Sequence, residues 1–383
     1  MFYALAAIIS FSACAITIKT LIGYTSLNLW AKLGIAFGIW FCWFGYLIVG
    51  YFHHHEGLSL PVYKVLSYMS YIGLGFGFIL LVLILVRDFA WFSSYGIAKI
   101  AKVGCCERLD PFNNFYLNVA NIVTVVIAVF LTVWGIYEAE KFPEIKEITI
   151  KDAKIKEPFK LVQINDLHIN RTTSVEKIEK FVEQINALNA DAIAIVGDVV
   201  DELPANIEKQ MQALSKLKSK YGRFTVFGNH DLYSGLLPWI KGFGQYNMGL
   251  LFNNGFEIKD KIYIAGIPDK SIEKMSAMIK IDLPKALSEN KNNLYTVLLS
   301  HSPYFTDDKI KGIDLQLSGH THGGQIFPFH FLVKAANKYL AGLYENDGYK
   351  LYVSRGAGYW GPPVRVLAPS EITVINLEPE NKF

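Results

Sequence analysis

The stretch DAIAIVGD, Asp191–Asp198, contains five consecutive apolar residues followed by a glycine and an aspartate. A short apolar run bounded by polar residues and glycine is typical of a buried β-strand. Five further stretches in the second part of the chain have the same character: KLVQIND, RFTVFGN, KIYIAGI, LYTVLLSH and DLQLSGH. The sequence therefore predicts a series of short strands, most of which end beside a polar residue.

Helical patterns separate these predicted strands. Apolar positions in VEKIEKFVEQINALN, Val175–Asn189, recur at the spacing of an amphipathic helix, and the segment after Asp201 has a similar periodicity. Strands, loops and helices that alternate in this way predict an α/β layered domain. In such domains the functional residues gather at the carboxyl ends of the strands.

The first part of the chain has a different composition. The 383 residues have a mean hydropathy of +0.26 and only 19% are charged, which is too apolar for an ordinary soluble protein. Residues 1–138 hold seven Lys/Arg and five Asp/Glu, whereas residues 139–383 hold 30 and 29. We therefore expect a transmembrane helical domain at residues 1–138 and a soluble domain at residues 139–383.

Four apolar stretches in residues 1–138 are each near the length of about 20 residues that a helix needs to cross a bilayer. They are Phe2–Ile18, Leu27–Tyr51, Val65–Val86 and Leu117–Tyr137. The first lacks the basic start of a signal peptide and is followed by three more, so we expect it to be retained. The sequence thus predicts an all-α membrane domain of about four helices.

Basic residues in the connecting segments predict an orientation. Lys19 and Lys32 flank the first loop, and the predicted third loop carries Arg87, Lys99, Lys102 and Arg108. Basic loops remain on the cytoplasmic side, which places the soluble domain outside the cytoplasm. Three lysines after the last span favour the opposite orientation: Lys141, Lys146 and Lys151.

Two classes of site are excluded by composition. All four cysteines, Cys14, Cys42, Cys105 and Cys106, lie in residues 1–138, so the soluble domain can form no disulfide and no thiolate metal site. Its near-neutral charge lacks the basic excess of a nucleic-acid-binding protein, and no nucleic-acid partner is expected. The sequence indicates no particular oligomeric state.

Residue types that bind metals cluster at the predicted strand ends, and of the six histidines after residue 138 only His330 lies elsewhere. The clusters are Asp166 and His168 in NDLH, Asp198 in GDVVD, Asn229, His230 and Asp231 in GNHD, His301 in LSHSP, and His320 and His322 in GHTHGGQ. In an extended backbone the side chains of His320 and His322 would share one face and converge. Five histidines beside Asp and Asn at strand ends predict a metal site.

In these blocks the chain resembles the calcineurin-like metallophosphoesterase superfamily, whose motifs DxH, GD, GNHD, H and GHxH occur here in the same order. The resemblance covers about Lys160–Leu377 and looks closest to the membrane-associated bacterial branch, because of GHTHGGQ and YVSRGAGYWGPPVRVLAPSEITVINL. One departure is Asn165, where a serine commonly precedes the aspartate. We expect it to affect only the surroundings of the ligands.

The resemblance implies a two-layer β-sandwich flanked by helices, with two divalent metal ions between the strand-end loops. It assigns three residues to one ion, three to the other and one to both: Asp166, His168 and His322; Asn229, His301 and His320; and Asp198. Nitrogen and oxygen donors without sulfur suit Mn, Fe or Zn. The branch implies the bacterial inner membrane as the location.

The predicted function is a membrane-anchored, dinuclear phosphohydrolase that cleaves a phosphoester with metal-activated hydroxide. We expect His230 to contact the phosphate and protonate the leaving oxygen. Asp231 either orients its ring or serves as a loop cap or local hydrogen-bond acceptor. Asp201 is interpreted as a helix or loop cap. Two alternatives are a phosphodiesterase or phosphatase for soluble nucleotides, anchored by the helices, and a non-catalytic membrane receptor that retains the fold. The complete ligand set argues against the receptor.

Two segments beside the site motifs are unusually apolar for loops, Leu232–Phe252 and Ile326–Tyr344. If their side chains are exposed, they indicate the bilayer surface or a lipid-linked phosphate or pyrophosphate as the partner. If their side chains are buried, they pack on the core or on the helical domain. The sequence is compatible with both.

Overall fold

The computed structural model describes residues 2–23, 25, 27–55, 57–102, 110–275, 278–303 and 311–380. Cys105, Cys106 and Arg108, which the sequence analysis used, lie outside these residues. The chain divides into two compact units. The helical unit comprises Met1–Glu140 and Gly361–Val366, and the sheet unit comprises Lys141–Trp360 and Leu367–Phe383.

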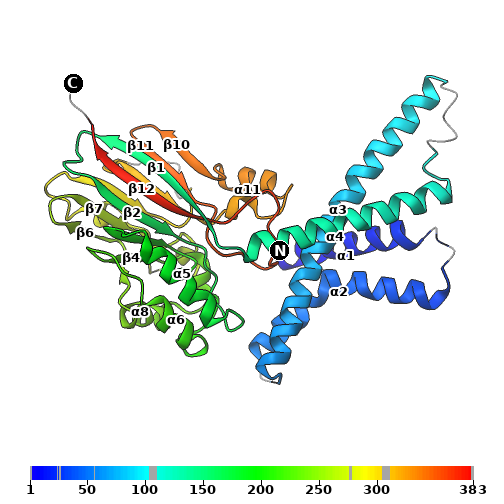
Figure 1. Ribbon diagram of the computed structural model, residues 1–383, viewed down its shortest axis with the longest axis horizontal. Helices are drawn as coiled ribbons and strands as arrows, with labels where there is room; N and C mark the ends of the chain where they lie inside the picture. The colour runs from blue at the N-terminus through cyan, green and yellow to red at the C-terminus, as the bar shows by residue number, and fades with distance from the viewer. Residues whose placement is uncertain are drawn as a thin grey trace. The chain divides into compact units, whose positions relative to one another are not determined.

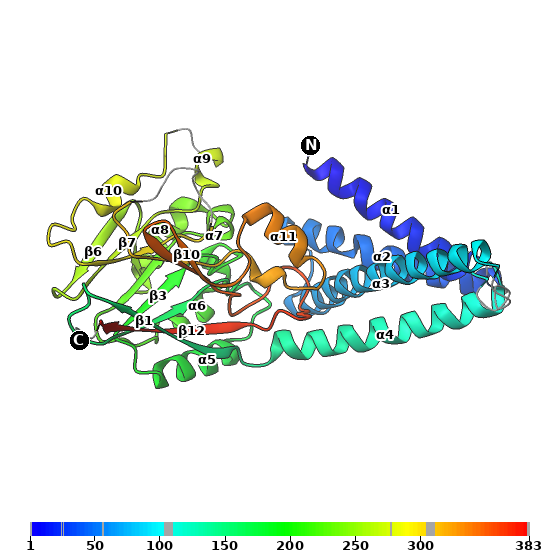
Figure 2. The same cartoon turned by 90° about the horizontal axis from the view of Figure 1, so that it is seen from above.

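The described residues of the helical unit form four helices, as the sequence predicted (Figure 2). They are α1 Phe2–Ile22, α2 Leu29–His54, α3 Leu60–Ile100 and α4 Asn114–Glu140. Within the described residues, Leu29–His53, Leu60–Ile100 and Asn114–Glu140 are long and apolar enough to cross a membrane, and Ala7–Ile22 is a shorter apolar helix. Small glycines let α2 and α3 approach closely, because a Cβ at Gly73 would lie 3.2 Å from Cα of Cys42.

Helix α3 is much longer than the predicted span Val65–Val86. At about 1.5 Å per residue, its 41 residues extend well beyond the hydrocarbon core of a bilayer. Arg87 and Lys99 therefore lie inside a helix, and their placement in a loop was wrong. The helix continues past Arg87 because its guanidinium is paired, with Asp88 at 2.7 Å and with Asn121 Oδ1 of α4 at 2.7 Å.

Segment Gly361–Val366 is distant in sequence from α1–α4 but packs within the helical unit. The N–H of Arg365 donates a hydrogen bond to the carbonyl of Gly135 in α4 at 2.8 Å. A Cβ at Gly75 of α3 would lie 3.1 Å from Cγ2 of Val364, so the small residue makes room for the segment. The chain thus returns once from the sheet unit to the helices.

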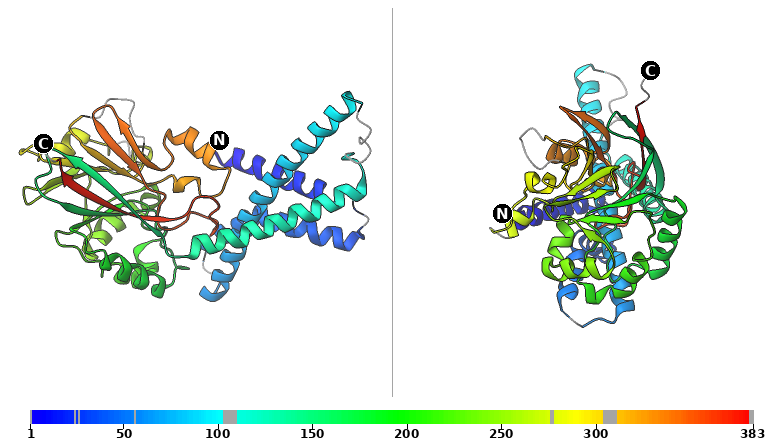
Figure 3. Two further views of the ribbon diagram at one scale, coloured as in Figure 1. Left: turned by 45° about the horizontal axis from the view of Figure 1, so that its top comes forward. Right: turned by 90° about the vertical axis from the view of Figure 1, so that its left-hand side faces the viewer.

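The sheet unit contains two six-stranded sheets. The first has the order β1 (Glu144–Asp152), β12 (Glu371–Pro379), β2 (Phe159–Ile164), β3 (Ala192–Val196), β4 (Arg223–Val226) and β5 (Gly249–Leu250). The second has the order β10 (Gly342–Asn346), β11 (Tyr349–Val353), β9 (Leu315–Ser318), β8 (Tyr295–Leu299), β7 (Ile262–Gly266) and β6 (Asn254–Ile258). Figure 3 shows β1 and β12 side by side, and they are paired in parallel.

The two sheets pack face to face around a buried apolar core that includes Leu161, Val196, Val297 and Leu317. This arrangement confirms the predicted two-layer β-sandwich. Helices α5 (Val175–Ala187), α6 (Glu208–Leu214) and α8 (Leu236–Gln245) cover the outer face of the first sheet (Figure 1). The remaining short elements are α7 (Asn229–Tyr233), α9 (Ile272–Met275), α10 (Leu283–Leu287), α11 (His330–Asn337) and the 3₁₀ turns η2 (Pro204–Asn206) and η3 (His322–Gly324).

Local sequence explains why α5 forms where the periodicity predicted it. The Ser174 hydroxyl accepts a hydrogen bond from the N–H of Lys177 at 3.1 Å and caps the first turn. Ile178, Phe181, Val182 and Ile185 recur at helical spacing and are buried against the sheet.

Strand directions bring the motif residues together. Strands β2, β3 and β4 are parallel neighbours in the first sheet, and β8 and β9 are parallel neighbours in the second. Because parallel neighbours end at the same edge, the loops that follow these five strands meet at one end of the sandwich.

Candidate metal centre

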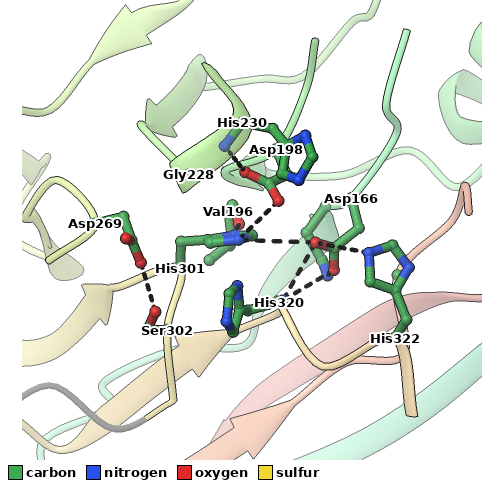
Figure 4. Close-up of polar contacts among 12 residues, drawn as sticks. Asp166, Val196, Asp198, Gly228, His230, Asp269, His301, Ser302, His320 and His322 are labelled. Atoms are coloured by element: carbon green, nitrogen blue, oxygen red, sulfur yellow. Dashed lines mark hydrogen bonds and ion pairs between the residues drawn. The ribbon is translucent and has the colours of Figure 1, made fainter. Parts of the chain in front are cut away.

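The loops that follow β2, β3, β4, β8 and β9 converge on one small volume, as the close-up in Figure 4 shows. Five of the side chains predicted as ligands come from residues with left-handed backbone: Asp166, His168, Asp198, His320 and His322, with φ between 48° and 69°. Such conformations are uncommon for residues other than glycine and cluster at functional sites. They turn each side chain away from the path of its strand.

One group of ligand-type atoms consists of Asp166, His168 and His322, whose donor atoms lie within 4.8 Å of one another. The Nε2 atoms of His168 and His322 are 3.1 Å apart. Nε2 of His322 lies 3.6 Å from Asp166 Oδ1. Nδ1 of His168 donates to the carboxylate of Asp201 at 2.9 Å, so in the neutral ring Nε2 is the atom with the lone pair.

A second group consists of Asp198, His301 and His320, also within 4.8 Å. Nδ1 of His301 donates to the carbonyl of Val196 at 2.9 Å. Because a carbonyl only accepts, the proton of the neutral ring is on Nδ1 and the lone pair is on Nε2. That Nε2 lies 3.1 Å from Asp198 Oδ2 and 3.9 Å from Asp166 Oδ1.

Asp198 lies between the two groups. Its Oδ2 is 3.1 Å from Nε2 of His301 and 3.8 Å from Nε2 of His168. Its Oδ1 accepts the backbone N–H of His230 at 2.8 Å, which fixes the carboxylate plane. A carboxylate in this position can contribute a ligand atom to a metal ion in either group.

The donor set fits divalent metal ions. Among the described residues, neither Asn229 Oδ1 nor His301 Nε2 has a hydrogen-bond partner, although both atoms are buried. Buried acceptors without partners are costly, and lone pairs that face carboxylates need a positive charge between them. Imidazole nitrogens with carboxylate and amide oxygens are the ligands of Mn, Fe and Zn.

Burial and nearby charge act on the ionisable groups in opposite directions. Burial opposes a charge on His168, but the carboxylates around it, above all that of Asp201, raise its pKa to about 9. Burial, followed by the charge of His301, lowers the pKa of His320 to about 4. Burial alone would raise the pKa of Asp198, yet His301 lowers it well below its usual value. The centre therefore favours positive charge at the point where the two groups meet.

The ring of His230 is held by Asp201. Nδ1 of His230 and Nδ1 of His168 both donate to Asp201 Oδ1 at 2.9 Å. Burial would raise the pKa of Asp201, but the two rings, His168 first, lower it below its usual value. Asp201 is thus an orienting residue, and its interpretation as a cap missed this role. The only signal in the sequence was its position three residues after Asp198 in GDVVD.

Of the two expectations for Asp231, orientation of His230 was wrong, and the local hydrogen-bond acceptor is what the structure has. Its Oδ1 accepts the N–H groups of Val199 and Val200 at 2.8 and 3.0 Å, and its Oδ2 accepts the N–H of Gly228 at 2.8 Å. The carboxylate therefore joins the loops after β3 and β4. Asp231 follows His230 in a helical turn, so its side chain points in a different direction.

His320 and His322 both lie in the small volume of the centre, although the backbone between them is not extended. His320 has φ 69°, and His322 begins η3 with φ 49°. The ring of His320 lies beside that of His301, with centroids 5.1 Å apart, and the ring of His322 lies beside that of His168 at 5.0 Å. The two residues thus belong to different groups, because the turn separates their rings.

Two small residues and one amide support the carboxylates. A Cβ at Gly228 would collide with the carboxylate of Asp198, and a Cβ at Gly319 would collide with Asn165. Nδ2 of Asn165 donates to Asp166 Oδ2 at 2.5 Å. Asn165 thus orients Asp166 from the surroundings of the centre.

A further buried carboxylate was missed. Asp269 follows β7, the strand KIYIAGI, for which the sequence offered no polar end. It accepts hydrogen bonds from the Ser302 hydroxyl and the Ser271 N–H. Burial would raise the pKa of Asp269, but His301 and the hydrogen bonds lower it. Asp269 thus fixes the side chain of Ser302, the residue that follows His301.

The two apolar segments divide between core and surface. In Leu232–Phe252, Trp239 and Phe243 are fully buried, whereas Leu237 is 76% exposed. All residues of α11 in the second segment are at least partly exposed, including Phe331 at 64%. Core packing therefore explains part of the apolar character of the first segment. It does not explain that of α11 in the second.

Comparison with known proteins agrees with this geometry. A family model described as calcineurin-like phosphoesterase matches residues 159–324, a range that contains every residue of both groups. An uncharacterized metallophosphoesterase of Campylobacter jejuni is 36% identical over 280 residues, which cover 71% of this chain and 73% of the relative. An uncharacterized metallophosphoesterase of Helicobacter pylori is 38% identical over 251 residues, covering 65% and 67%. A Danio rerio protein named transmembrane protein with metallophosphoesterase domain is 30% identical over 272 residues, covering 67% of this chain and 62% of its own length.

Proposed function

The chain belongs to the calcineurin-like metallophosphoesterase family, and on that premise we propose that it is a membrane-anchored phosphohydrolase with two divalent metal ions. Its proposed substrates are phosphoesters, including lipid-linked phosphates and pyrophosphates. The observation that carries the proposal is the pair of buried acceptors without partners, Asn229 Oδ1 and His301 Nε2. They lie in a set of imidazoles and carboxylates that divalent cations would satisfy.

The two groups, with Asn229 added to the second and Asp198 shared, suggest how the ligands divide between two ions. Asp166, His168 and His322 would hold one ion, and Asn229, His301 and His320 would hold the other. Asp198 would bind both, since its Oδ2 lies near the lone pairs of His301 and His168. When bound, two divalent ions supply Lewis acidity that lowers the pKa of water and neutralises charge on the phosphoryl group.

His230 is the proposed general acid. Its side chain is 23% exposed, in contrast to the buried histidines around Asp198, so a substrate can reach it. The hydrogen bond to Asp201 keeps a proton on Nδ1 and orients the ring. Nε2 is therefore the ring atom that would give its proton to the leaving oxygen.

A hydrolysis assay tests the proposal. Detergent-purified full-length protein is assayed with bis(p-nitrophenyl) phosphate and p-nitrophenyl phosphate, with Mn, Fe or Zn added, and compared with Asp198→Asn. The proposal expects turnover that requires both the metal and Asp198. Metal-independent turnover, or equal turnover by Asp198→Asn, would contradict it.

We further propose that the chain is integral to the bacterial inner membrane, with the sheet unit outside the cytoplasm. Lys19 and Lys99 lie in the last turns of α1 and α3, Lys32 lies in the first turn of α2, and Lys102 follows α3. These helix ends border the first and third connections, and basic residues there mark the cytoplasmic side. Alkaline phosphatase fused to the C-terminus should be active, and a green fluorescent protein fused there should be dark. The reverse pattern would place the sheet unit in the cytoplasm.

A further inference from the structure

Two exposed aromatic side chains flank the ring of His230. Tyr233, at the end of α7, has its ring centroid 5.8 Å from that of His230, and Trp360 has its centroid 6.2 Å away. Tyr233 is 63% exposed and Trp360 is 52% exposed. Both rings thus lie beside the proposed general acid while keeping much of their surface open to solvent.

The position of Trp360 is fixed by a residue of the metal-binding loop. The backbone N–H of Trp360 donates to Gln325 Oε1 at 2.9 Å, and Nε2 of Gln325 donates to the backbone carbonyl of Trp360 at 2.9 Å. Gln325 is buried and follows His322 by three residues in GHTHGGQ. A reciprocal pair of this kind holds the backbone of Trp360 in register with the ligand loop, although the indole itself is exposed.

The place of the two rings indicates what they contact. His230 would protonate the leaving oxygen, so a group bonded to that oxygen must lie on the His230 side of the centre. Large aromatic surfaces left in water are unfavourable and commonly mark a binding surface. The leaving group of the substrate is the part of the reactants that can cover them.

We propose that Tyr233 and Trp360 form an aromatic clamp that binds an alkyl chain on the leaving group of the phosphoester, with Gln325 as its positioning residue. This inference rests on the proposed function. The inference adds to that function that the apolar part of the substrate is on its leaving group.

Neighbouring residues favour an alkyl chain over a nucleobase. The segments that carry the clamp continue into exposed aliphatic and aromatic side chains, with Leu237 and Ile240 after Tyr233 and Phe327 after Gln325. Trp360 is also joined directly to Gly361–Val366, the segment that packs with the membrane helices α3 and α4.

Alkylphosphonates test the clamp by binding, without a need for turnover. Calorimetry on the Mn-loaded, full-length protein measures Kd for methyl-, ethyl-, propyl- and butylphosphonate. Half-burial of each added methylene should tighten binding about twofold, or roughly eightfold from methyl to butyl. In Trp360→Ala and Tyr233→Ala the loss of affinity relative to the wild type should grow with chain length. The gain in affinity from methyl- to butylphosphonate should therefore fall to about twofold or less. Gln325→Ala should flatten the gain in the same way.

Phe256→Ala is the matched control. Phe256 is also 52% exposed, but it lies on β6 at the sheet edge and packs on Phe224. This variant should keep the full gain with chain length. Adenosine monophosphate serves as the comparison ligand with an aromatic base.

Each contrary result has a distinct meaning. An equal gain in Trp360→Ala, Tyr233→Ala and the wild type, or no gain in the wild type, would overturn the clamp while leaving the proposed function intact. Tighter binding of adenosine monophosphate than of butylphosphonate, lost in Trp360→Ala, would overturn the alkyl assignment. No Mn-dependent phosphonate binding by folded protein would contradict the proposed function itself, and the clamp with it.

Discussion

Nδ1 of His230 donates a hydrogen bond to Asp201 Oδ1 at a distance of 2.9 Å. The same oxygen accepts from Nδ1 of His168, also at 2.9 Å. One carboxylate atom therefore fixes the ring of the proposed general acid and the ring of a proposed metal ligand. We therefore expect proton donation and metal binding to be coupled through it.

Replacing Asp201 should weaken both functions at once. In Asp201→Asn the negative charge that orients two imidazoles is lost, and we expect metal affinity and kcat each to fall roughly 10- to 100-fold. Metal content after dialysis and turnover at saturating metal measure the two effects. Asp260→Asn, in the exposed turn between β6 and β7, is the control and should match the wild type. Unchanged metal content and unchanged kcat in Asp201→Asn would refute the coupling.

Asp231 should contribute to stability instead. Its carboxylate accepts three buried backbone N–H groups, whereas an asparagine offers one acceptor oxygen and turns an amide N–H₂ toward a donor. We expect Asp231→Asn to lower the free energy of unfolding by about 2–3 kcal/mol. Denaturant unfolding followed by fluorescence measures it. Wild-type stability with a reduced kcat would instead support the role that the sequence suggested, orientation of His230.

Loss of His230 should affect chemistry more than metal binding. In His230→Ala we expect kcat to fall roughly 10²- to 10⁴-fold, with the bound metal retained. Because the leaving oxygen of an alkyl ester needs protonation more than that of a nitrophenyl ester, the loss should be larger for the alkyl ester. The comparison uses kcat for p-nitrophenyl phosphate and for butyl phosphate. A variant with full activity on both esters would exclude His230 as the acid.

A single added methyl group at Gly228 should disturb the centre. Gly228 has φ −88°, so alanine is allowed by the backbone, but its Cβ would collide with the carboxylate of Asp198. We expect Gly228→Ala to lose metal and activity together, as judged by metal analysis and hydrolysis. Gly244→Ala in α8 is the matched control, since no atom lies within 4 Å of its Cβ position. Normal metal content in Gly228→Ala would show that the loop yields to the added group.

The sequence predicted the sandwich and the gathering of ligand-type residues because both follow from local patterns. Each apolar run is short, and each motif residue comes directly after a strand, as with Val196 and Asp198. The orienting role of Asp201 was not predictable, because it depends on two rings that are 33 and 29 residues away in sequence. The separation of His320 from His322 depends on left-handed backbone that residue spacing does not reveal.

Long-range packing explains what else the sequence missed. Nothing local in GPPVRV indicates that Gly361–Val366 belongs with α3 and α4, since its partners Gly75 and Gly135 lie more than 200 residues earlier. The length of α3 was underestimated because Arg87 seemed to end an apolar run. Its pairing with Asp88 and Asn121 offsets the cost of the charge and lets the helix continue.

Metal stoichiometry tests the central claim most directly. Inductively coupled plasma mass spectrometry on full-length protein, purified in detergent with Mn and then desalted, gives the number of ions per chain. The account predicts two ions in the wild type, one in His322→Ala, one in Asn229→Ala and fewer than one in Asp198→Asn. A folded wild-type protein that binds no metal, or one whose metal content is the same in all four proteins, would contradict the dinuclear centre.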